Sequence, residues 1–186
     1  MSEAREAAVL MLLQSIDGEP NVLFTKRTVG LKEHSGEMCF PGGSVETGET
    51  LLETALREVE EELGIRERDV AVVAALDPVN TYTTNFNVTC FVGRLWPTAD
   101  FVPEPKEVAE VVYVPLSFLL DPESLRVEVY DTPQGEREVY FFNYGEHEIW
   151  GATARMLKQF LDRYDAADPV LVGLKALEGA DWARVR

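Results

Sequence analysis

Short apolar runs along the chain predict a sheet, because they are bounded by turn residues and are too brief for long helices. The first two runs are separated by Asp17-Gly18-Glu19-Pro20, a sequence typical of a tight turn between neighbouring strands. The expected strands are 7–13, 22–27, 70–76, 86–95 and 109–114, and a hairpin is expected over 125–143.

Two segments have helical spacing instead. Residues 50–63 and 151–164 repeat apolar positions every three to four residues, which favours helices packed on a sheet. Residues 28–43 predict a loop that ends in Phe40-Pro41-Gly42-Gly43, and the tail at 165–186 is ambiguous. Mixed strands and helices indicate an α+β fold.

The helix over 50–63 has clear boundaries in the sequence. Thr50 followed by Glu53 fits a capping box, and Gly64 fits a left-handed C-terminal cap. On a helical wheel one face is apolar and is expected to face the core. Its members are Leu52, Leu56, Val59 and Leu63.

A second face of this helix carries Glu58, Glu61 and Glu62, whose spacing brings three like charges together. A hard cation such as Mg²⁺ or Mn²⁺ relieves that repulsion, since carboxylate oxygens suit it. The alternative is a solvated acidic face, which is the usual fate of a glutamate run.

The loop before the helix supplies further candidate chemistry. Glycines at 42 and 43 let the backbone approach a ligand closely. Their N–H groups suit an oxyanion and their carbonyls suit a metal ion. The alternative is a plain tight turn.

Composition narrows the function classes. The 186 residues include 17 Lys+Arg and 33 Asp+Glu, which gives a net charge of −16. This charge argues against nucleic acid as a binding partner. It does not argue against a small anionic substrate, because bound cations can reverse the local field. No apolar run reaches the length of a membrane span, and the first residues do not resemble a signal peptide. Cys39 and Cys90 give no disulfide framework, so a cytoplasmic location is expected, with Cys39 buried and not nucleophilic.

The loop and the helix combine into one pattern. Gly43, Glu49, Arg57-Glu58-Val59, Glu61-Glu62 and Gly64-Ile65 stand at the spacing of the Nudix box, which this segment resembles at every fixed position. The resemblance implies a Nudix hydrolase: one domain over 1–186 with an α/β/α sandwich and a mixed β-sheet. It also implies hydrolysis of a nucleoside diphosphate linked to another group.

The resemblance assigns roles within the box at 43–65. It makes Glu58 and Glu62 the principal ligands of Mg²⁺ or Mn²⁺, with Glu61 a third and the Gly43 carbonyl a fourth. Arg57 is implied to orient a ligating carboxylate and completes the catalytic group. Glu49 lies opposite Glu58 on the wheel, which favours a salt bridge or a cap over catalysis.

A second pattern over 23–43 is similar to the motif of the coenzyme A pyrophosphatase subfamily, although Phe24, Thr28 and Lys32 depart from it. Ile149-Trp150-Gly151-x-Thr153-Ala154-Arg155 is also similar to that subfamily, more weakly. The implied reaction cleaves coenzyme A or its derivatives to 3′,5′-ADP and 4′-phosphopantetheine or its acyl form. The alternative is another nucleoside diphosphate derivative such as ADP-ribose or NADH. The implied substrate-binding residues are Thr25, Arg27, Lys32, Gly36, Phe40, Pro41 and Gly42.

The general base is left open between Glu104, Glu107 and a helix glutamate, with a solvated loop as the alternative for the first two. Arg27 and Lys32 are expected to bind the 3′-phosphate of a coenzyme A-like substrate. An adenine ring has Tyr82, Phe141 and Tyr144 available, each of which also suits the core or the sheet surface. The expected partner is therefore a small nucleotide, with no nucleic acid, no membrane, and a homodimer left open.

Overall fold

The computed structural model describes residues 4–28, 36–82, 84–96, 99, 101–132 and 135–165. Lys32 and the tail beyond Asp165 therefore lie outside the described residues. None of the helices in those ranges has the length and hydropathy needed to cross a membrane.

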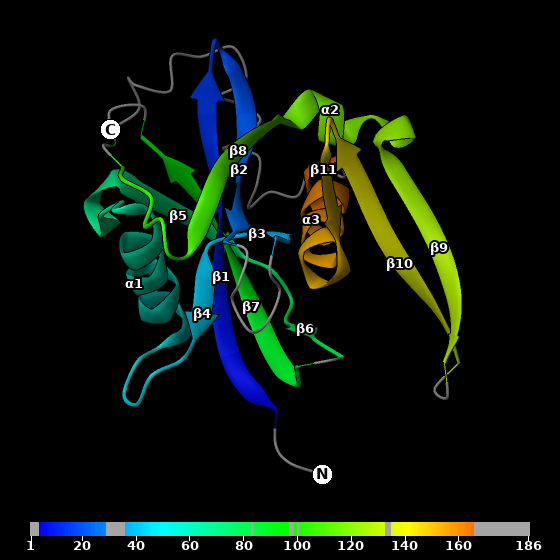
Figure 1. Ribbon diagram of the computed structural model, residues 1–186, viewed down its shortest axis with the longest axis horizontal. Coiled ribbons are helices and arrows are strands. Elements are labelled where there is room, and N and C mark those ends of the chain that lie inside the picture. The colour runs from blue at the N-terminus through cyan, green and yellow to red at the C-terminus, as the bar shows by residue number, and fades with distance from the viewer. Residues whose placement is uncertain are drawn as a thin grey trace.

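A mixed sheet forms the centre of the molecule (Figure 1). β1 (Arg5–Ile16) runs parallel to β7 (Phe86–Leu95), whereas the other strand pairs of this sheet in the described ranges are antiparallel. The prediction of a mixed sheet is confirmed. The remaining strands of the sheet are β2 (Glu19–Arg27), β3 (Met38–Cys39), β4 (Gly42–Ser44), β5 (Val70–Ala75), β6 (Val79–Asn80) and β8 (Val108–Pro115).

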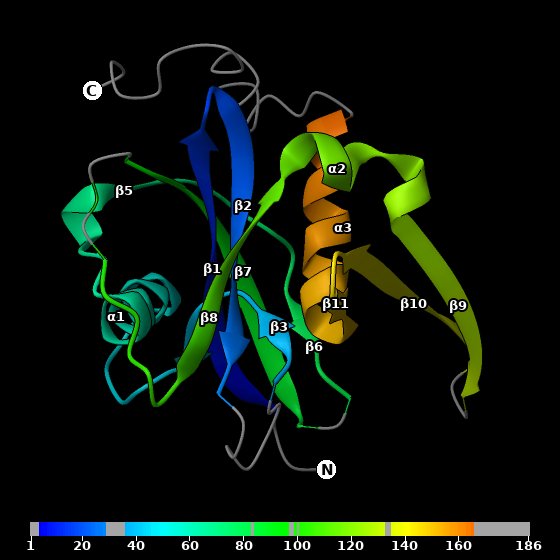
Figure 2. The ribbon, with the colours of Figure 1, turned by 45° about the horizontal axis from the view of Figure 1, so that its top comes forward.

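Helices cover both faces of this sheet. Figures 1 and 2 show α1 (Leu51–Leu63) on one side, α3 (Gly151–Asp165) on the other, and a second sheet beyond α3. This arrangement confirms the expected α/β/α sandwich. The second sheet contains β9 (Leu125–Thr132), β10 (Gly135–Tyr144) and β11 (His147–Trp150). The short helical elements are α2 (Leu116–Leu120) and the 3₁₀ turns Glu67–Asp69 and Pro122–Ser124.

The turn between β1 and β2 follows the sequence prediction. Asp17 and Gly18 have φ values of 52° and 82°, as a two-residue type I′ hairpin requires. This turn fixes the register that pairs Ile16 with Glu19.

The core lies on both faces of β1, which explains why its sequence is apolar without alternation. Leu10 and Leu12 pack with Val59 and Leu63 on the α1 side. Met11 and Leu13, which point the other way, pack on the α3 side with Leu157 and Phe160. Burial on both faces holds the two helices in fixed positions relative to the sheet.

Two expectations were wrong in detail. Leu52 is 37% exposed, so the buried stripe of α1 begins at Thr54 and Ala55 rather than at Leu52. The expected loop over 28–43 contains β3 and the start of β4. The sequence also did not indicate α2 or β11, both of which are too short for a periodic signal.

Candidate metal and substrate site

The ends of α1 are fixed by local hydrogen bonds. The Glu53 backbone N–H donates to Thr50 Oγ1 at 3.3 Å, and the Thr50 N–H donates to Glu53 Oε2 at 2.8 Å. Gly64 adopts φ 69°, and its N–H donates to the Glu60 carbonyl. The capping predictions are therefore confirmed, and the rotation of the helix decides where its glutamates lie.

The three box glutamates differ sharply in burial. Glu61 is exposed, Glu58 is half-buried, and Glu62 is only 3% exposed. Because Val59 and Leu63 are fully buried in this part of α1, the neighbouring Glu62 lies at the edge of the core beside them. The helix thus places Glu58 and Glu62, one turn apart, at the boundary between core and surface.

Arg57 forms the centre of an ion-pair network. Its Nε donates to Glu49 Oε1 at 2.6 Å, and its Nη1 donates to Glu58 Oε1 and Glu61 Oε2, both at 3.0 Å. Glu49 also accepts a hydrogen bond from Thr54, and its contacts, chiefly the one from Arg57, lower its pKa to about 2. Glu49 is therefore a structural partner of Arg57, as its position on the wheel suggests. The hydrogen bonds that Arg57 donates to Glu58 and Glu61 each engage a single oxygen of the carboxylate.

The glycine pair brings backbone against the carboxylates. A Cβ on Gly43 would lie 2.2 Å from Glu58 Oε1, so only glycine allows this approach. A Cβ on Gly42 would lie 2.4 Å from the Ala8 carbonyl oxygen, because β4 pairs closely with β1. The loop is therefore a point of close approach rather than a plain tight turn.

Burial makes the charge of the two inner glutamates costly. It raises the pKa of Glu62 to about 8, against the opposing charge of Arg27, and Glu58 adds to the rise. Burial also raises the pKa of Glu58, although Arg57 acts in the opposite direction. The backbone N–H of Gly42 donates to the Glu62 carboxylate.

These donors fit a hard divalent cation, since two partly desolvated carboxylates lie beside a glycine backbone. Within the described ranges, no three Asp, Glu, His or Cys side chains close around a single point as a metal cage. The groups of this chain that could hold such an ion are Glu58, Glu62 and the Gly43 carbonyl. Glu61 lies farther out, in contact with Arg57. Magnesium bound by few carboxylates takes its remaining oxygens from water and substrate phosphate.

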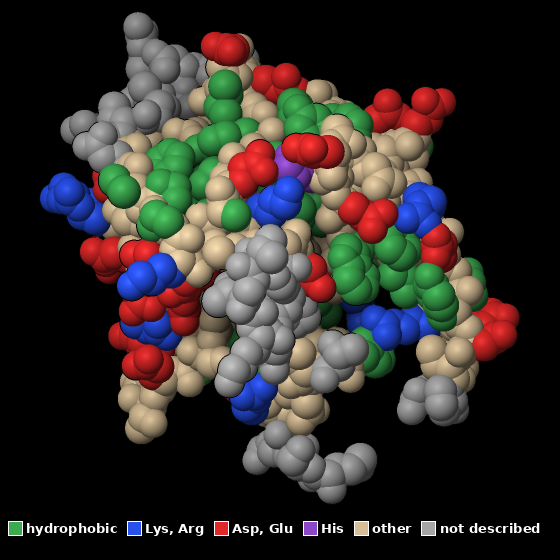
Figure 3. All heavy atoms as spheres, in the orientation of Figure 1, with side chains coloured by type: hydrophobic (Ala, Val, Ile, Leu, Met, Phe, Trp, Pro, Cys, Tyr) green, Lys and Arg blue, Asp and Glu red, His purple; other side chains and the backbone are tan. Residues whose placement is uncertain are grey.

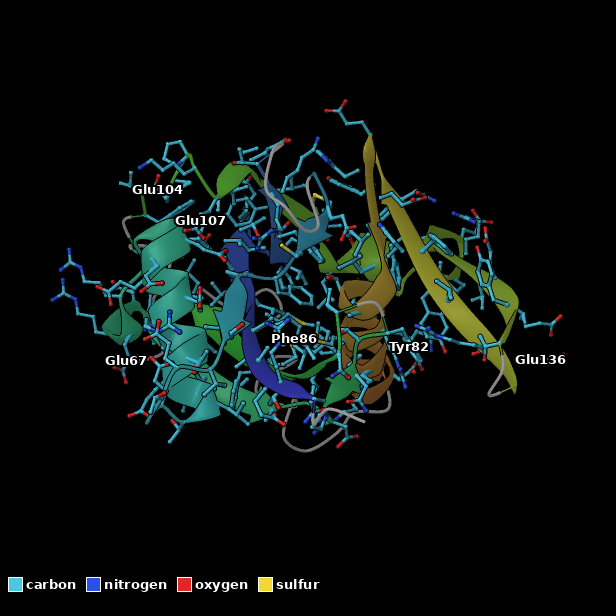
Figure 4. The ribbon with its side chains drawn as sticks, turned by 60° about the horizontal axis from the view of Figure 1, so that its bottom comes forward. Glu67, Tyr82, Phe86, Glu104, Glu107 and Glu136 are labelled. Carbon is cyan, nitrogen blue, oxygen red and sulfur yellow. The ribbon has the colours of Figure 1, made fainter. Side chains whose placement is uncertain are left out.

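The loop that carries Glu104 and Glu107 docks on the C-terminal end of α1 (Figure 4). The Glu104 backbone N–H donates to the Glu62 carbonyl at 2.8 Å. The charge of Glu107 raises the pKa of both Glu58 and Glu62, which places its carboxylate near that pair. The Glu104 side chain accepts from the Lys106 backbone N–H instead. Of the two candidate bases, Glu107 is better placed.

A cavity of about 350 Å³ opens on the α3 side of the sheet. Arg27, Phe40 and Gly42 line it, as three of the residues expected to bind substrate. Arg27 and Gly42 also act on Glu62, so the cavity and the acidic cluster share a wall. A substrate that reaches the glutamates past Gly42 therefore has room for its other end.

The other expected substrate-binding residues shape the loop rather than line the cavity. The buried Thr25 hydroxyl lies 3.3 Å from both the Cys39 carbonyl oxygen and Sγ. Gly36, with φ 75°, donates its N–H to the Arg27 carbonyl, and the Pro41 carbonyl accepts from Leu10. Cys39 is half-buried, and its surroundings raise its pKa to about 11, so the thiol is neutral at physiological pH.

The cavity is also lined by residues that the sequence did not identify, or identified only weakly, as substrate-binding candidates. Arg137 of β10 lies over the ring of Tyr82, 3.2 Å from its centroid, and both residues line the cavity. Trp150 and Arg155 line it as well, from the segment with the weaker subfamily resemblance. Nothing in the local pattern of β10 indicates Arg137.

Of the aromatic residues considered for adenine, Tyr82 alone lines this cavity. Phe141 is buried, and Tyr144 packs edge-on against Phe118.

The class of this protein follows from the fold, the box and one comparison. A family model described as the NUDIX domain matches residues 4–134, and the chain belongs to the Nudix family. It is a Nudix hydrolase, a class that uses divalent metal ions.

Known relatives match most of the chain. It is 36% identical over 156 residues to an uncharacterized Nudix hydrolase NudL of Photorhabdus laumondii, covering 83% of this chain and 82% of the relative. It is 38% identical over 161 residues to the chloroplastic Nudix hydrolase 22 of Arabidopsis thaliana, covering 82% of this chain and 53% of the longer plant protein. Among solved structures, a MutT protein from Methanosarcina mazei Go1 matches with a TM-score of 0.57 at 21% identity, over 90% of this chain and 98% of that one. The last match shows the fold alone.

Proposed function

We propose that this Nudix hydrolase cleaves the diphosphate bond of coenzyme A and its derivatives with Mg²⁺ or Mn²⁺. The products are 3′,5′-ADP and 4′-phosphopantetheine or its acyl form. The observation that carries the proposal is the wall shared by the Glu58–Glu62 pair and the cavity, formed by Gly42 and Arg27. The subfamily motif includes both residues of this wall. A diphosphate bound at the glutamates would lie next to the cavity, which has room for the nucleoside end of the substrate.

Each group of the site has a separate proposed role. Glu58, Glu62 and the Gly43 carbonyl would hold the divalent ions, and Arg57 keeps the Glu58 carboxylate oriented through its 3.0 Å hydrogen bond. Bound ions neutralise the diphosphate and lower the pKa of a water molecule. Glu107 accepts the proton of the attacking water, and Arg27 binds a phosphate oxygen at the mouth of the cavity.

A second candidate is hydrolysis of ADP-ribose, NADH or a related nucleoside diphosphate. Phe24, Thr28 and Lys32 depart from the coenzyme A motif, and lysine lacks the two-pronged geometry with which arginine binds phosphate. The aromatic lining of the cavity suits the adenine ring of either class of substrate.

One assay separates the candidates. The purified chain is incubated with Mg²⁺ or Mn²⁺ and with coenzyme A, ADP-ribose or NADH, and the products are resolved by chromatography. We expect 3′,5′-ADP from coenzyme A at the highest kcat/KM, and loss of activity in a chelator that is restored by the ion. Release of AMP from NADH, with coenzyme A untouched, would reject the first candidate in favour of the second.

A further inference from the structure

The cavity contains more positive charge than a diphosphate alone requires. We propose that Arg137 and Arg155 bind a phosphomonoester that the substrate carries on its ribose, separate from the diphosphate. The cavity then selects nucleotides with that additional phosphate. This inference rests on the proposed function, because it assigns the part of the substrate that the acidic cluster does not reach.

Positive charge is concentrated in this cavity. Acidic residues outnumber basic ones by 33 to 17 in the chain, yet three arginines line this single cavity. Glu37 is the acidic side chain among the described residues that line it. Figure 3 shows basic side chains beside a hollow near β9 and β10, whereas acidic side chains gather over α1. A basic cavity in an acidic protein favours an anionic ligand there.

The three arginines of the cavity have different surroundings. The charge of Arg27 acts on Glu62, so this arginine lies beside the acidic cluster and is better placed for the diphosphate than for the 3′-phosphate expected from the sequence. Arg137 comes from β10 and Arg155 from α3, two elements of the other layer. In the part of the chain that the structure describes, neither forms a salt bridge with a carboxylate. Their charges are therefore available to a phosphate that is separate from the one at Arg27.

An exposed aromatic surface lines the same cavity as these arginines. Tyr82 is 61% exposed and Trp150 is 44% exposed, although both line a cavity whose walls are otherwise largely apolar. Figure 4 shows Tyr82 close to α3, on the opposite side of the sheet from α1. Exposed aromatic faces beside cations suit a nucleobase whose ribose carries a phosphate. The face of Tyr82 also positions the guanidinium of Arg137.

Binding to the metal-free protein tests the assignment without relying on turnover. Adenosine 3′,5′-bisphosphate and AMP, which differ by the additional phosphate, are titrated by calorimetry into the wild type and into Arg137→Gln, Arg155→Gln and the double variant. We expect the wild type to prefer the bisphosphate by about 10- to 100-fold, and each single variant to lower that preference by about 10-fold. Tyr82→Leu should weaken both ligands, and Tyr82→Phe should restore them.

Arg126→Gln is the matched control. Arg126 lies over the Phe141 ring on the same small sheet but does not line the cavity, so the preference should persist. Circular dichroism melting establishes that each variant is folded. Equal affinity of the wild type for the two nucleotides, or a preference retained by the double variant, would overturn the assignment.

The same measurements separate this inference from the proposed function. Selective binding of the bisphosphate by a protein that leaves coenzyme A intact would support the phosphate site and refute the proposed substrate. Equal kcat/KM for coenzyme A and dephospho-coenzyme A would leave the hydrolase proposal standing and overturn the phosphate site.

Discussion

The two sides of the central sheet are built in different ways. On the α1 side, the acidic cluster comes mainly from a continuous stretch between Gly43 and Glu62, held by a capped helix. On the α3 side, the cavity is assembled from segments far apart in the sequence, including Arg27, Tyr82 and Arg137. The proposed catalytic residues are therefore determined by local sequence, whereas the proposed substrate-binding cavity depends on tertiary packing.

Such a division has a simple consequence for variants. A change on the α1 side should slow the hydrolysis of every substrate, because all of them present a diphosphate to the same carboxylates. A change on the α3 side should alter the choice among substrates.

Glu62→Gln tests the α1 side most directly. Glutamine keeps the size of the side chain and an oxygen for the Gly42 N–H, but it removes the negative charge that a divalent ion requires. We expect kcat to fall by about 10³-fold on coenzyme A and on any slower substrate alike. Steady-state kinetics measures the loss, and the melting temperature should not decrease, since a neutral amide suits a buried position.

Glu60→Gln is the matched control for that variant. Glu60 is exposed on the same helix, in the helical turn between Glu58 and Glu62, and should keep wild-type kinetics. Full activity of Glu62→Gln would contradict the metal assignment. A loss confined to one substrate would contradict the division between the two sides of the sheet.

Substitution of Gly43 and substitution of Gly42 should have different effects. In Gly43→Ala the new methyl meets the flexible end of Glu58, which can swing aside, so we expect kcat to fall by about 10- to 100-fold. In Gly42→Ala the methyl meets the backbone of Ala8 and Val9, so we expect a loss of about 2 kcal/mol in the free energy of unfolding.

Paired kinetics and chemical denaturation distinguish these outcomes. If Gly43→Ala lost stability while keeping its turnover, the close approach of backbone to Glu58 would be merely structural. An unchanged unfolding free energy for Gly42→Ala would show that β4 can move away from β1.

The thiols give the smallest expected effect. Burial is the main cause that raises the pKa of Cys39 to about 11 and that of Cys90 to about 12, so both thiols stay protonated at pH 8. We expect negligible alkylation by iodoacetamide at pH 8 in the native protein and two modified residues after denaturation. The Cys39 rate should rise about tenfold per pH unit below its pKa, because the thiolate is the nucleophile. Rapid native alkylation at pH 8, measured by mass spectrometry, would contradict this account.

The sequence predicted what local signals determine. The capping box at Thr50, the left-handed cap at Gly64 and the turn at Asp17-Gly18 all formed as expected, because each depends on residues within a few positions of one another. The mixed sheet and its two helical layers were also predicted, both of them through the family resemblance.

Tertiary packing determined the rest. The wheel placed Leu52 in the core and the glutamates outside it, but contact with the sheet turns the helix so that Glu62 is buried and Leu52 is exposed. Arg137 could not be found from the sequence, because its place beside Tyr82 depends on how the small sheet packs against α3. Short elements such as β11 lack the length that makes a periodic pattern visible.

The position of β1 also has a consequence for synthesis on the ribosome. β1 is made before its parallel partner β7, whose Thr89 pairs with Ala8, so this contact forms only after both segments have been synthesised. Until then, β1 can pair with β2 and β4 along one edge, but its other edge lacks a strand. Nascent chains that end before residue 86 should therefore expose this apolar edge and bind holdase chaperones, and the native sheet should close only once β7 has been made.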